Sequence, residues 1–177
     1  MTSSKVTRLA LSKPVIGAIE GYAVAGGFEL ALWCDLRIAA SNAVFGVFNR
    51  RWGVPLMDGG TVRLPRLVGV GRALEITMTG RPVPADEALQ IGLVNELTPP
   101  GSTLTRAMEV AQTRDGLPQD AMNLDRRSIY GQVGNTLRQA MVAEFRQSLA
   151  AQGAESGAAQ FVACAGRHSV RLSERQE

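Results

Sequence analysis

The segment Pro14-Val-Ile-Gly-Ala-Ile-Glu-Gly-Tyr-Ala-Val-Ala-Gly-Gly-Phe-Glu-Leu-Ala-Leu-Trp-Cys-Asp35 carries the clearest fold signal in the chain. Residues 15–19 form a short, mostly apolar and partly β-branched run bounded by proline and glycine, which is typical of a buried strand. Gly26 and Gly27 follow in a turn, and residues 28–33 favour a helix. The segment therefore predicts a strand, a glycine turn and a helix.

The predicted turn has two interpretations. Glycines at a helix start leave backbone N–H groups exposed at the positive end of the helix dipole, where a carbonyl oxygen that gains negative charge would be stabilised. Glu29, one turn inside the helix, could move protons near that oxygen. Alternatively the turn serves close packing, and a glutamate in a first helical turn is favoured by the dipole alone. The glycine spacing excludes a G-x-G-x-x-G dinucleotide fingerprint and a P-loop.

Residues 13–35 resemble the signature of the crotonase (enoyl-CoA hydratase/isomerase) family. Comparable segments follow in the family's order: Phe45-Gly46, Gly59-Gly60-Thr61 with Arg63-Leu64-Pro65-Arg66, Leu74 to Gly80, Ala85-Asp86-Glu87-Ala88 and Gly92-Leu93-Val94. The similarity is close over residues 9–97 and looser beyond. It implies an α/β fold, a ββα superhelix of the ClpP/crotonase type with a C-terminal helical cap. We also expect the chain to lack the usual N-terminal portion of the family, which contains several strands.

The rest of the chain agrees with such a fold. The pattern predicts strands at 36–40, 44–47 and 93–97, a loop at 48–57, a helix that opens after Asp58 and is interrupted or bent at Pro65, and helices at 71–79 and 84–91. Pro99-Pro100-Gly101 marks a break, so we expect a ββα core at residues 1–101 and a helical region at 102–177. By resemblance, that region packs on the core and on neighbouring subunits of a homotrimer or hexamer.

The resemblance assigns roles to single residues. Gly26 matches the position whose N–H is one oxyanion-hole donor to the thioester carbonyl, and the partner donor belongs to the N-terminal portion. Glu29 matches the first of two acids that activate water and deliver a proton at Cα. The second acid of the family falls at the position of Asn49, whose amide can position a water but cannot exchange a proton at neutral pH.

Asp58 is the candidate for the missing acid. It lies near where dienoyl-CoA isomerases of the family place a catalytic aspartate, and two carboxylates in a partly desolvated pocket could shuttle a proton between carbons of an acyl-CoA. The alternative is that Asp58 only caps its helix, which is worth ~1 kcal/mol. Phe48, Trp52, Leu56 and Met57 are candidates for the acyl pocket, with ordinary core packing as the alternative.

Composition narrows the function classes. The net charge is only +3 and aromatic residues make up 5%, so a nucleic-acid surface with stacking residues is not indicated. No apolar run is long enough for a membrane span, and we expect a cytoplasmic protein. His168 is the only histidine and the two cysteines have no metal-ligand spacing, which disfavours a histidine-dependent hydrolase and a metal site.

The resemblance to the crotonase family therefore implies a lyase or isomerase of fatty acid metabolism that acts on an acyl-CoA thioester. It would hydrate a 2-enoyl-CoA or shift its double bond, with coenzyme A present only as part of the substrate and no other cofactor. The alternative is a non-catalytic acyl-CoA-binding or oligomer-scaffold protein with an incomplete active site. Another reaction of the family, such as thioester hydrolysis or decarboxylation, also stays open because the oxyanion turn serves all of them.

Overall fold

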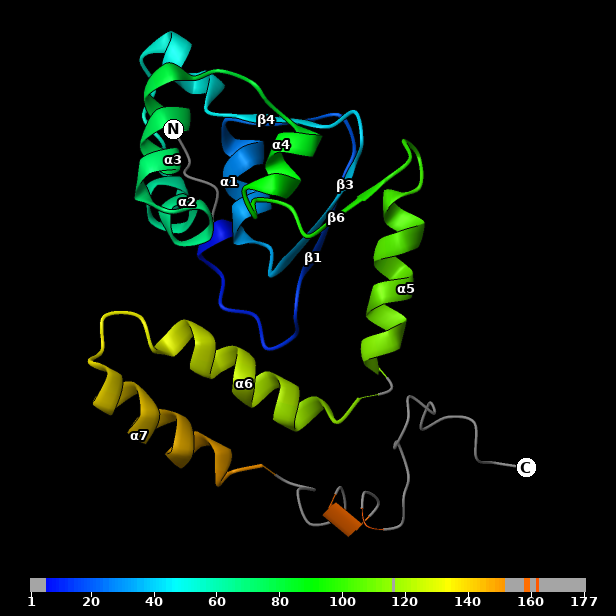
Figure 1. The fold of residues 1–177 in the computed structure, drawn as a ribbon, viewed down its shortest axis with the longest axis vertical. Helices are drawn as coiled ribbons and strands as arrows, with labels where there is room; N and C mark the ends of the chain where they lie inside the picture. Colours follow the sequence, from blue (N-terminus) through cyan, green and yellow to red (C-terminus); the bar gives the residue numbers. More distant parts are fainter. Residues whose placement is uncertain (1–5, 116, 152–157, 160–161, 163–177) are drawn as a thin grey trace. The chain divides into compact units, whose positions relative to one another are not determined.

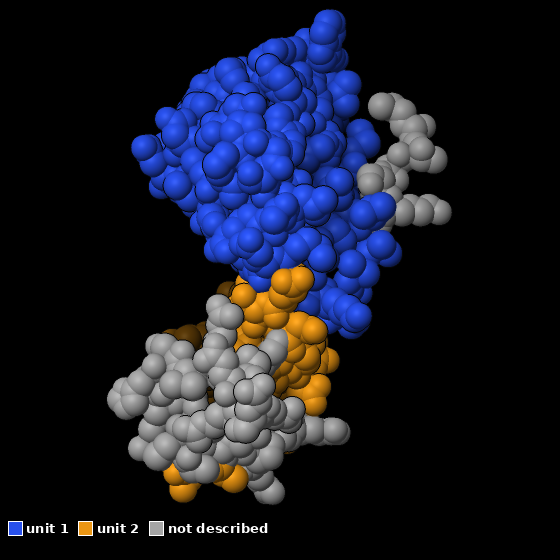
Figure 2. Space-filling model, turned by 90° about the vertical axis from the view of Figure 1, so that its right-hand side faces the viewer, with its two compact units in different colours: residues 1–110 blue, residues 111–177 orange. Residues whose placement is uncertain are grey.

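The computed structural model describes residues 6–115, 117–151, 158, 159 and 162 of the 177-residue chain. The chain divides into two compact units, residues 1–110 and 111–177 (Figure 2). Within the described ranges no helix has the length and apolar character needed to cross a membrane. His168 and Cys164 lie outside the described residues.

The first unit contains two three-stranded sheets. The first sheet has the order β1-β3-β6 and is parallel, and the second has the order β2-β4-β5, with β2 and β4 parallel and β5 antiparallel. The strands are β1 (Ile16–Ile19), β2 (Tyr22–Val24), β3 (Leu36–Ala40), β4 (Val44–Gly46), β5 (Val83–Pro84) and β6 (Glu96–Thr98). Two consecutive strands thus enter different sheets before a helix follows, as a ββα unit requires.

Helices connect and cover these strands (Figure 1). The unit contains the 3₁₀-helices η1 (Val6–Arg8) and η2 (Phe48–Trp52) and the α-helices α1 (Gly26–Trp33), α2 (Gly60–Val68), α3 (Val70–Thr79) and α4 (Ala85–Gln90), and α5 (Thr103–Asp115) runs across the unit boundary. Helix α2 contacts both α1 and α3. Helix α1 therefore lies between β2 of the second sheet and helix α2.

Several sequence expectations need correction. Residues 22–24, where no strand was expected, form β2, because they pair in parallel with β4. The segment expected to be a loop begins with η2, and the last strand is β6 rather than residues 93–97. Pro65 lies inside α2 without ending it, since the helix continues to Val68 and Gly69 still donates to the Pro65 carbonyl at 3.1 Å.

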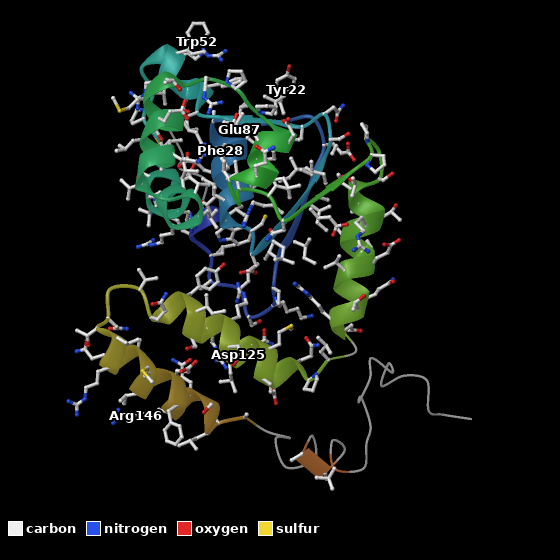
Figure 3. The ribbon with its side chains drawn as sticks, viewed as in Figure 1. Tyr22, Phe28, Trp52, Glu87, Asp125 and Arg146 are labelled. Atoms are coloured by element: carbon white, nitrogen blue, oxygen red, sulfur yellow. The ribbon has the colours of Figure 1, made fainter. Side chains whose placement is uncertain are left out.

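The core of the first unit lies between the sheets and helices. Phe28 of α1 and Phe45 of β4 are fully buried, with ring centroids 6.5 Å apart in a tilted arrangement. Leu64, Ile76 and Leu93 are buried in the same cluster, and each belongs to a different segment of the chain. This packing fixes α1 through Phe28, one residue before Glu29 (Figure 3).

The second unit contains the antiparallel-type hairpin of α6 (Gln119–Gly131) and α7 (Leu137–Ser148), which contact each other. A capping box starts α7: Gln139 N donates to Thr136 Oγ1 at 3.3 Å, and Thr136 N donates to Gln139 Oε1 at 3.0 Å. The apolar side chains that follow at four-residue spacing, Leu137, Met141 and Phe145, are exposed. One face of α7 is thus apolar and uncovered among the described residues.

Candidate active site at the start of helix α1

The turn before α1 is built around Ala25. Ala25 has φ 51° and ψ −122°, and it is the only non-glycine among the described residues with positive φ. Its N–H donates to the Gly46 carbonyl at the end of β4, and its carbonyl accepts from Glu29 N. A left-handed alanine costs about 1–3 kcal/mol, and such strain is kept where the surroundings over-determine the backbone. The strain is therefore held between β4 and the first turn of α1.

Gly26 is the first residue of α1, so its N–H has no acceptor within the helix. Gly26 and Gly27 are exposed, and a Cβ built at either position would meet no atom within 4 Å. The positive end of the helix dipole points the same way. An oxygen carrying partial negative charge could thus approach this amide without steric hindrance.

Glu29 is almost completely buried, with 3% of its surface exposed. Two backbone amides donate to the same carboxylate oxygen, Oε1: Asp58 N and Gly60 N, each at 2.8 Å. The other oxygen, Oε2, accepts no hydrogen bond from the described residues. Such bonds to a carboxylate are among the stronger kind, so they fix the group and leave one oxygen available for proton exchange.

Gly60 is the point of closest approach to the carboxylate. A Cβ built there would lie 3.0 Å from Glu29 Oε1 and 2.9 Å from Leu56 Cδ1. Only a residue without a side chain lets the turn approach Glu29 this closely. The turn at 58–60 and the start of α1, about thirty residues apart in sequence, thus form one structural unit.

Asp58 is buried and lies directly beside Glu29 through its own amide. Its expected role as the helix N-cap is wrong in detail, because Gly59 is the N-cap residue of α2 and provides no side-chain cap. Gly59 has φ 99°, a conformation that suits glycine, and it has no side chain that could cap the helix. The buried Asp58 carboxyl is thus not accounted for by capping through the N-cap position.

Asn49 lies in η2 and has a buried, unsatisfied acceptor. Its Nδ2 donates to the Val54 carbonyl at 2.8 Å, and its own carbonyl accepts from Val54 N at 3.1 Å. The side-chain oxygen Oδ1 is buried and has no partner among the described residues. A buried acceptor without a donor costs about 1–3 kcal/mol, so a water or ligand that brings a donor would be favoured at this atom.

The predicted pocket residues differ in their surroundings. The Phe48 ring lies over Gly46, where a Cβ would be 2.6 Å from Cε1, and the Arg51 guanidinium stacks 3.9 Å from the ring centroid. Phe48 is thereby next to the residue that binds Ala25. Met57 is partly exposed, but Trp52 is 82% exposed and points away from the core in Figure 3. Trp52 therefore lines no interior pocket within this structure.

A separate charge cluster lies away from Glu29. Arg81 bridges Glu75 and Glu87, with four hydrogen bonds of 2.5–2.9 Å. Hydrogen bonds from Arg81 lower the pKa of both carboxyls below the ordinary value. Within the described ranges no group of three or more His, Cys, Asp or Glu residues could hold a metal ion. The cluster is a partly exposed ion-pair network that joins α3 to α4.

Sequence reasoning missed two contributors. Ala25 is strained, but its neighbours in sequence give no sign of a positive φ. Arg63 was quoted only as part of a motif, yet it donates to the Asp58 carbonyl at 3.0 Å. The contact of Arg63 could have been expected from the sequence. Side chains in a helix point back toward its N-terminus, so an arginine four residues after Gly59 can reach the turn.

Comparisons with known proteins agree with this arrangement. The sequence profile described as enoyl-CoA hydratase/isomerase matches residues 4–162. A short-chain-enoyl-CoA hydratase from Clostridium acetobutylicum is 44% identical over 119 residues, covering 67% of this chain and 46% of the relative. A crotonyl-CoA hydratase from Syntrophomonas wolfei is 50% identical over 109 residues, covering 60% of this chain and 42% of the relative. The chain thus spans less than half the length of these curated relatives.

Solved structures show the same fold. An enoyl-CoA hydratase from Mycobacterium tuberculosis superposes with a TM-score of 0.84 at 33% identity, covering 90% of this chain and 64% of that one. An enoyl-CoA hydratase from Bacillus anthracis gives a TM-score of 0.81 at 34% identity, covering 88% and 61%. These matches confirm the expected crotonase-type ββα architecture. The chain belongs to the enoyl-CoA hydratase/isomerase family.

Proposed function

We propose that the protein processes a 2-enoyl-CoA thioester, by adding water across its double bond or by moving that bond. The observation that carries the proposal is Glu29: a buried carboxylate held at Oε1, free of hydrogen bonds from the described residues at Oε2, one turn from the exposed amide of Gly26. A base beside an oxyanion donor is what proton transfer at the α-carbon of a thioester requires.

In the proposed reaction the thioester carbonyl oxygen accepts a hydrogen bond from Gly26 N–H. During hydration, Glu29 Oε2 takes a proton from water as the water oxygen adds to Cβ, the electron pair of the double bond moves toward the carbonyl oxygen, and the proton is then delivered to Cα when the enolate collapses. The developing enolate is stabilised more than the neutral thioester, so the amide lowers the barrier. Glu29 Oε2 is the group that exchanges the proton. During isomerisation the same oxygen removes a proton from one carbon and returns it to another.

Asn49 and Asp58 complete the proposal. Oδ1 of Asn49, which accepts no hydrogen bond from the described residues, suits a position where it binds the reacting water or the substrate. Asp58, buried beside Glu29, is proposed as the second acid. Phe48, which lies against Gly46, is proposed to border the acyl chain. Met57, which directly precedes Asp58 in the sequence, is proposed to do the same.

The test replaces Glu29 by glutamine, which keeps the shape and an acceptor but cannot take up a proton. Turnover of 2-enoyl-CoA esters should fall by about 10²–10⁴-fold, the usual contribution of a general acid/base. Asp86→Asn is the matched control, because it removes the same charge from an exposed position in α4. Unchanged turnover in Glu29→Gln would remove Glu29 from the mechanism.

A panel of enoyl-CoA esters separates the enzyme from the scaffold alternative. Calorimetry measures binding, and a product assay on the same esters measures turnover. Binding of these esters without any product would support the non-catalytic alternative. Turnover abolished by Glu29→Gln, with binding retained, would support the enzyme.

We also propose a homo-oligomer, in which the exposed apolar face of α7, formed by Leu137, Met141 and Phe145, is covered by another copy. Uncovered apolar faces of this kind mark interaction surfaces in soluble proteins. Light scattering of the purified chain measures its mass directly. A monomer at all concentrations would refute this part of the proposal.

A further inference from the structure

Arg63 lies one turn inside α2, and its side chain contacts the 58–60 turn. Its Nη1 donates to the Asp58 carbonyl at 3.0 Å, and its Nη2 donates to the Thr7 carbonyl at 2.7 Å. The guanidinium also lies against Gly59, because a Cβ built there would overlap Nη1. One side chain therefore binds the turn and η1 at the same time.

The turn is consequently held from two directions. Its carbonyl, at Asp58, is bound by a cation, while its two amides, at Asp58 and Gly60, are bound by the Glu29 carboxylate. The Asp58 carbonyl lies between these two amides along the backbone, so a bond that fixes this carbonyl restricts the movement of both amides. The guanidinium has a planar fork of donors, which lets it reach two carbonyls without reorientation.

The second carbonyl that Arg63 binds belongs to a buried residue. Thr7 is 1% exposed, so the second arm of Arg63 ends in the interior rather than on the surface. Arg8 adds a further tie between η1 and the same loop, since its Nη2 donates to the Met57 carbonyl at 2.8 Å. A loop fixed at two successive carbonyls has little freedom to move its amides away from Glu29.

We propose that Arg63 is a positioning residue for Glu29. It does not touch the reacting atoms; it fixes the turn whose two amides orient the carboxylate and leave Oε2 available. This inference rests on the proposed function of Glu29, but the hydrogen bonds on which it depends can be measured without any turnover.

The experiment compares three variants of the full chain. Arg63→Ala removes both arms, Arg63→Lys keeps the charge but only a single-point donor, and Arg66→Ala is the control, since it removes an exposed arginine from the same helix. Amide hydrogen exchange at Asp58 and Gly60 is followed by NMR. In Arg63→Ala exchange at both amides should rise at least about tenfold, in Arg63→Lys it should rise less, and in Arg66→Ala it should stay as in the parent.

Turnover supplies the second readout. A misplacement of about 1 Å costs on the order of 10²-fold in rate, so kcat for a 2-enoyl-CoA should fall by about 10–100-fold in Arg63→Ala, with KM changed much less. If Arg63→Ala does not fold, Arg63→Lys is compared with the parent chain by the same exchange rates and kcat. Exchange rates unchanged in a folded Arg63 variant would overturn the inference, and so would faster exchange with full kcat.

The two proposals fail in different ways. If the parent chain turns over no enoyl-CoA but the Asp58 and Gly60 amides respond to Arg63, the proposed function fails while the contact from Arg63 to the turn stands. If turnover depends on Glu29 but the amides ignore Arg63, the function stands and the positioning role fails.

Discussion

Gly60→Ala is the sharpest test of how Glu29 is held. Gly60 is the first residue of α2, and its φ is not in the positive region, so alanine fits the backbone there. In a helix without other constraints, this change stabilises a protein by about 0.4–1 kcal/mol. The added Cβ would nevertheless lie 3.0 Å from Glu29 Oε1, 3.1 Å from Glu29 Cγ and 2.9 Å from Leu56 Cδ1. The carboxylate therefore has to move.

The expected cost is that of one amide bond to a charged group, about 1.5–3 kcal/mol. After the gain from alanine is subtracted, the unfolding free energy should fall by about 1–2 kcal/mol. Turnover of a 2-enoyl-CoA should fall by about 10²-fold because the carboxylate is displaced from its working position. Both effects arise from a single methyl group.

Gly71→Ala is the matched control. Gly71 is the second residue of α3, and its added Cβ would meet nothing within 4 Å, so this variant should gain about 0.4–1 kcal/mol and keep its turnover. Unfolding is followed in urea by tryptophan fluorescence, because both tryptophans, Trp33 and Trp52, belong to the first unit. If Gly60→Ala is as stable and as active as Gly71→Ala, the hydrogen bonds from the 58–60 turn do not hold Glu29 in the way described.

Two further predictions use the same fluorescence assay. Ala25→Gly removes strain of about 1–3 kcal/mol at the cost of about 0.5–1 kcal/mol in backbone entropy, so it should raise the unfolding free energy by about 1 kcal/mol, and a loss of stability would contradict the strained geometry. Arg81→Gln should cost about 1 kcal/mol at pH 7, because two partly exposed ion pairs are lost. The pKa values of Glu75 and Glu87 are lowered in the folded state, so this stabilisation is complete above their ordinary pKa and is lost as the pH falls through the lowered values; a difference between parent and variant that persists in strong acid would refute it.

Much of the fold could be predicted from local patterns. The apolar run predicted as a strand at 15–19 forms β1 at 16–19, and the helix predicted after the glycine turn forms α1. Both signals are local, because the β-branched run and the turn glycines are read from neighbouring residues. β2 was missed, since the four residues between Gly21 and Gly26, three of which form this strand, are too few to carry a periodic signal. The tolerance of Pro65 within α2 was missed as well, because tertiary packing overrides a local breaker.

The site was only partly predictable. The motif identified Gly26 and Glu29, but the burial of Glu29 depends on amides of Asp58 and Gly60, and no local pattern reports such a contact. The exposure of Trp52 was also unpredictable, because the sequence does not show whether a large aromatic side chain near a candidate pocket points into it or toward solvent. Contacts between residues far apart in sequence are the part that only the folded structure supplies.

The lone acceptor on Asn49 has a thermodynamic consequence for selectivity. Nδ2 of Asn49 donates to the Val54 carbonyl, so rotation of the amide to move its oxygen would break that hydrogen bond. A ligand that donates an O–H or N–H to this atom supplies a hydrogen bond that the described residues do not provide, worth on the order of 1–3 kcal/mol, or roughly five- to 150-fold in affinity. Two ligands that differ by a single hydroxyl at that point should therefore differ in binding by about this ratio, which calorimetry would measure.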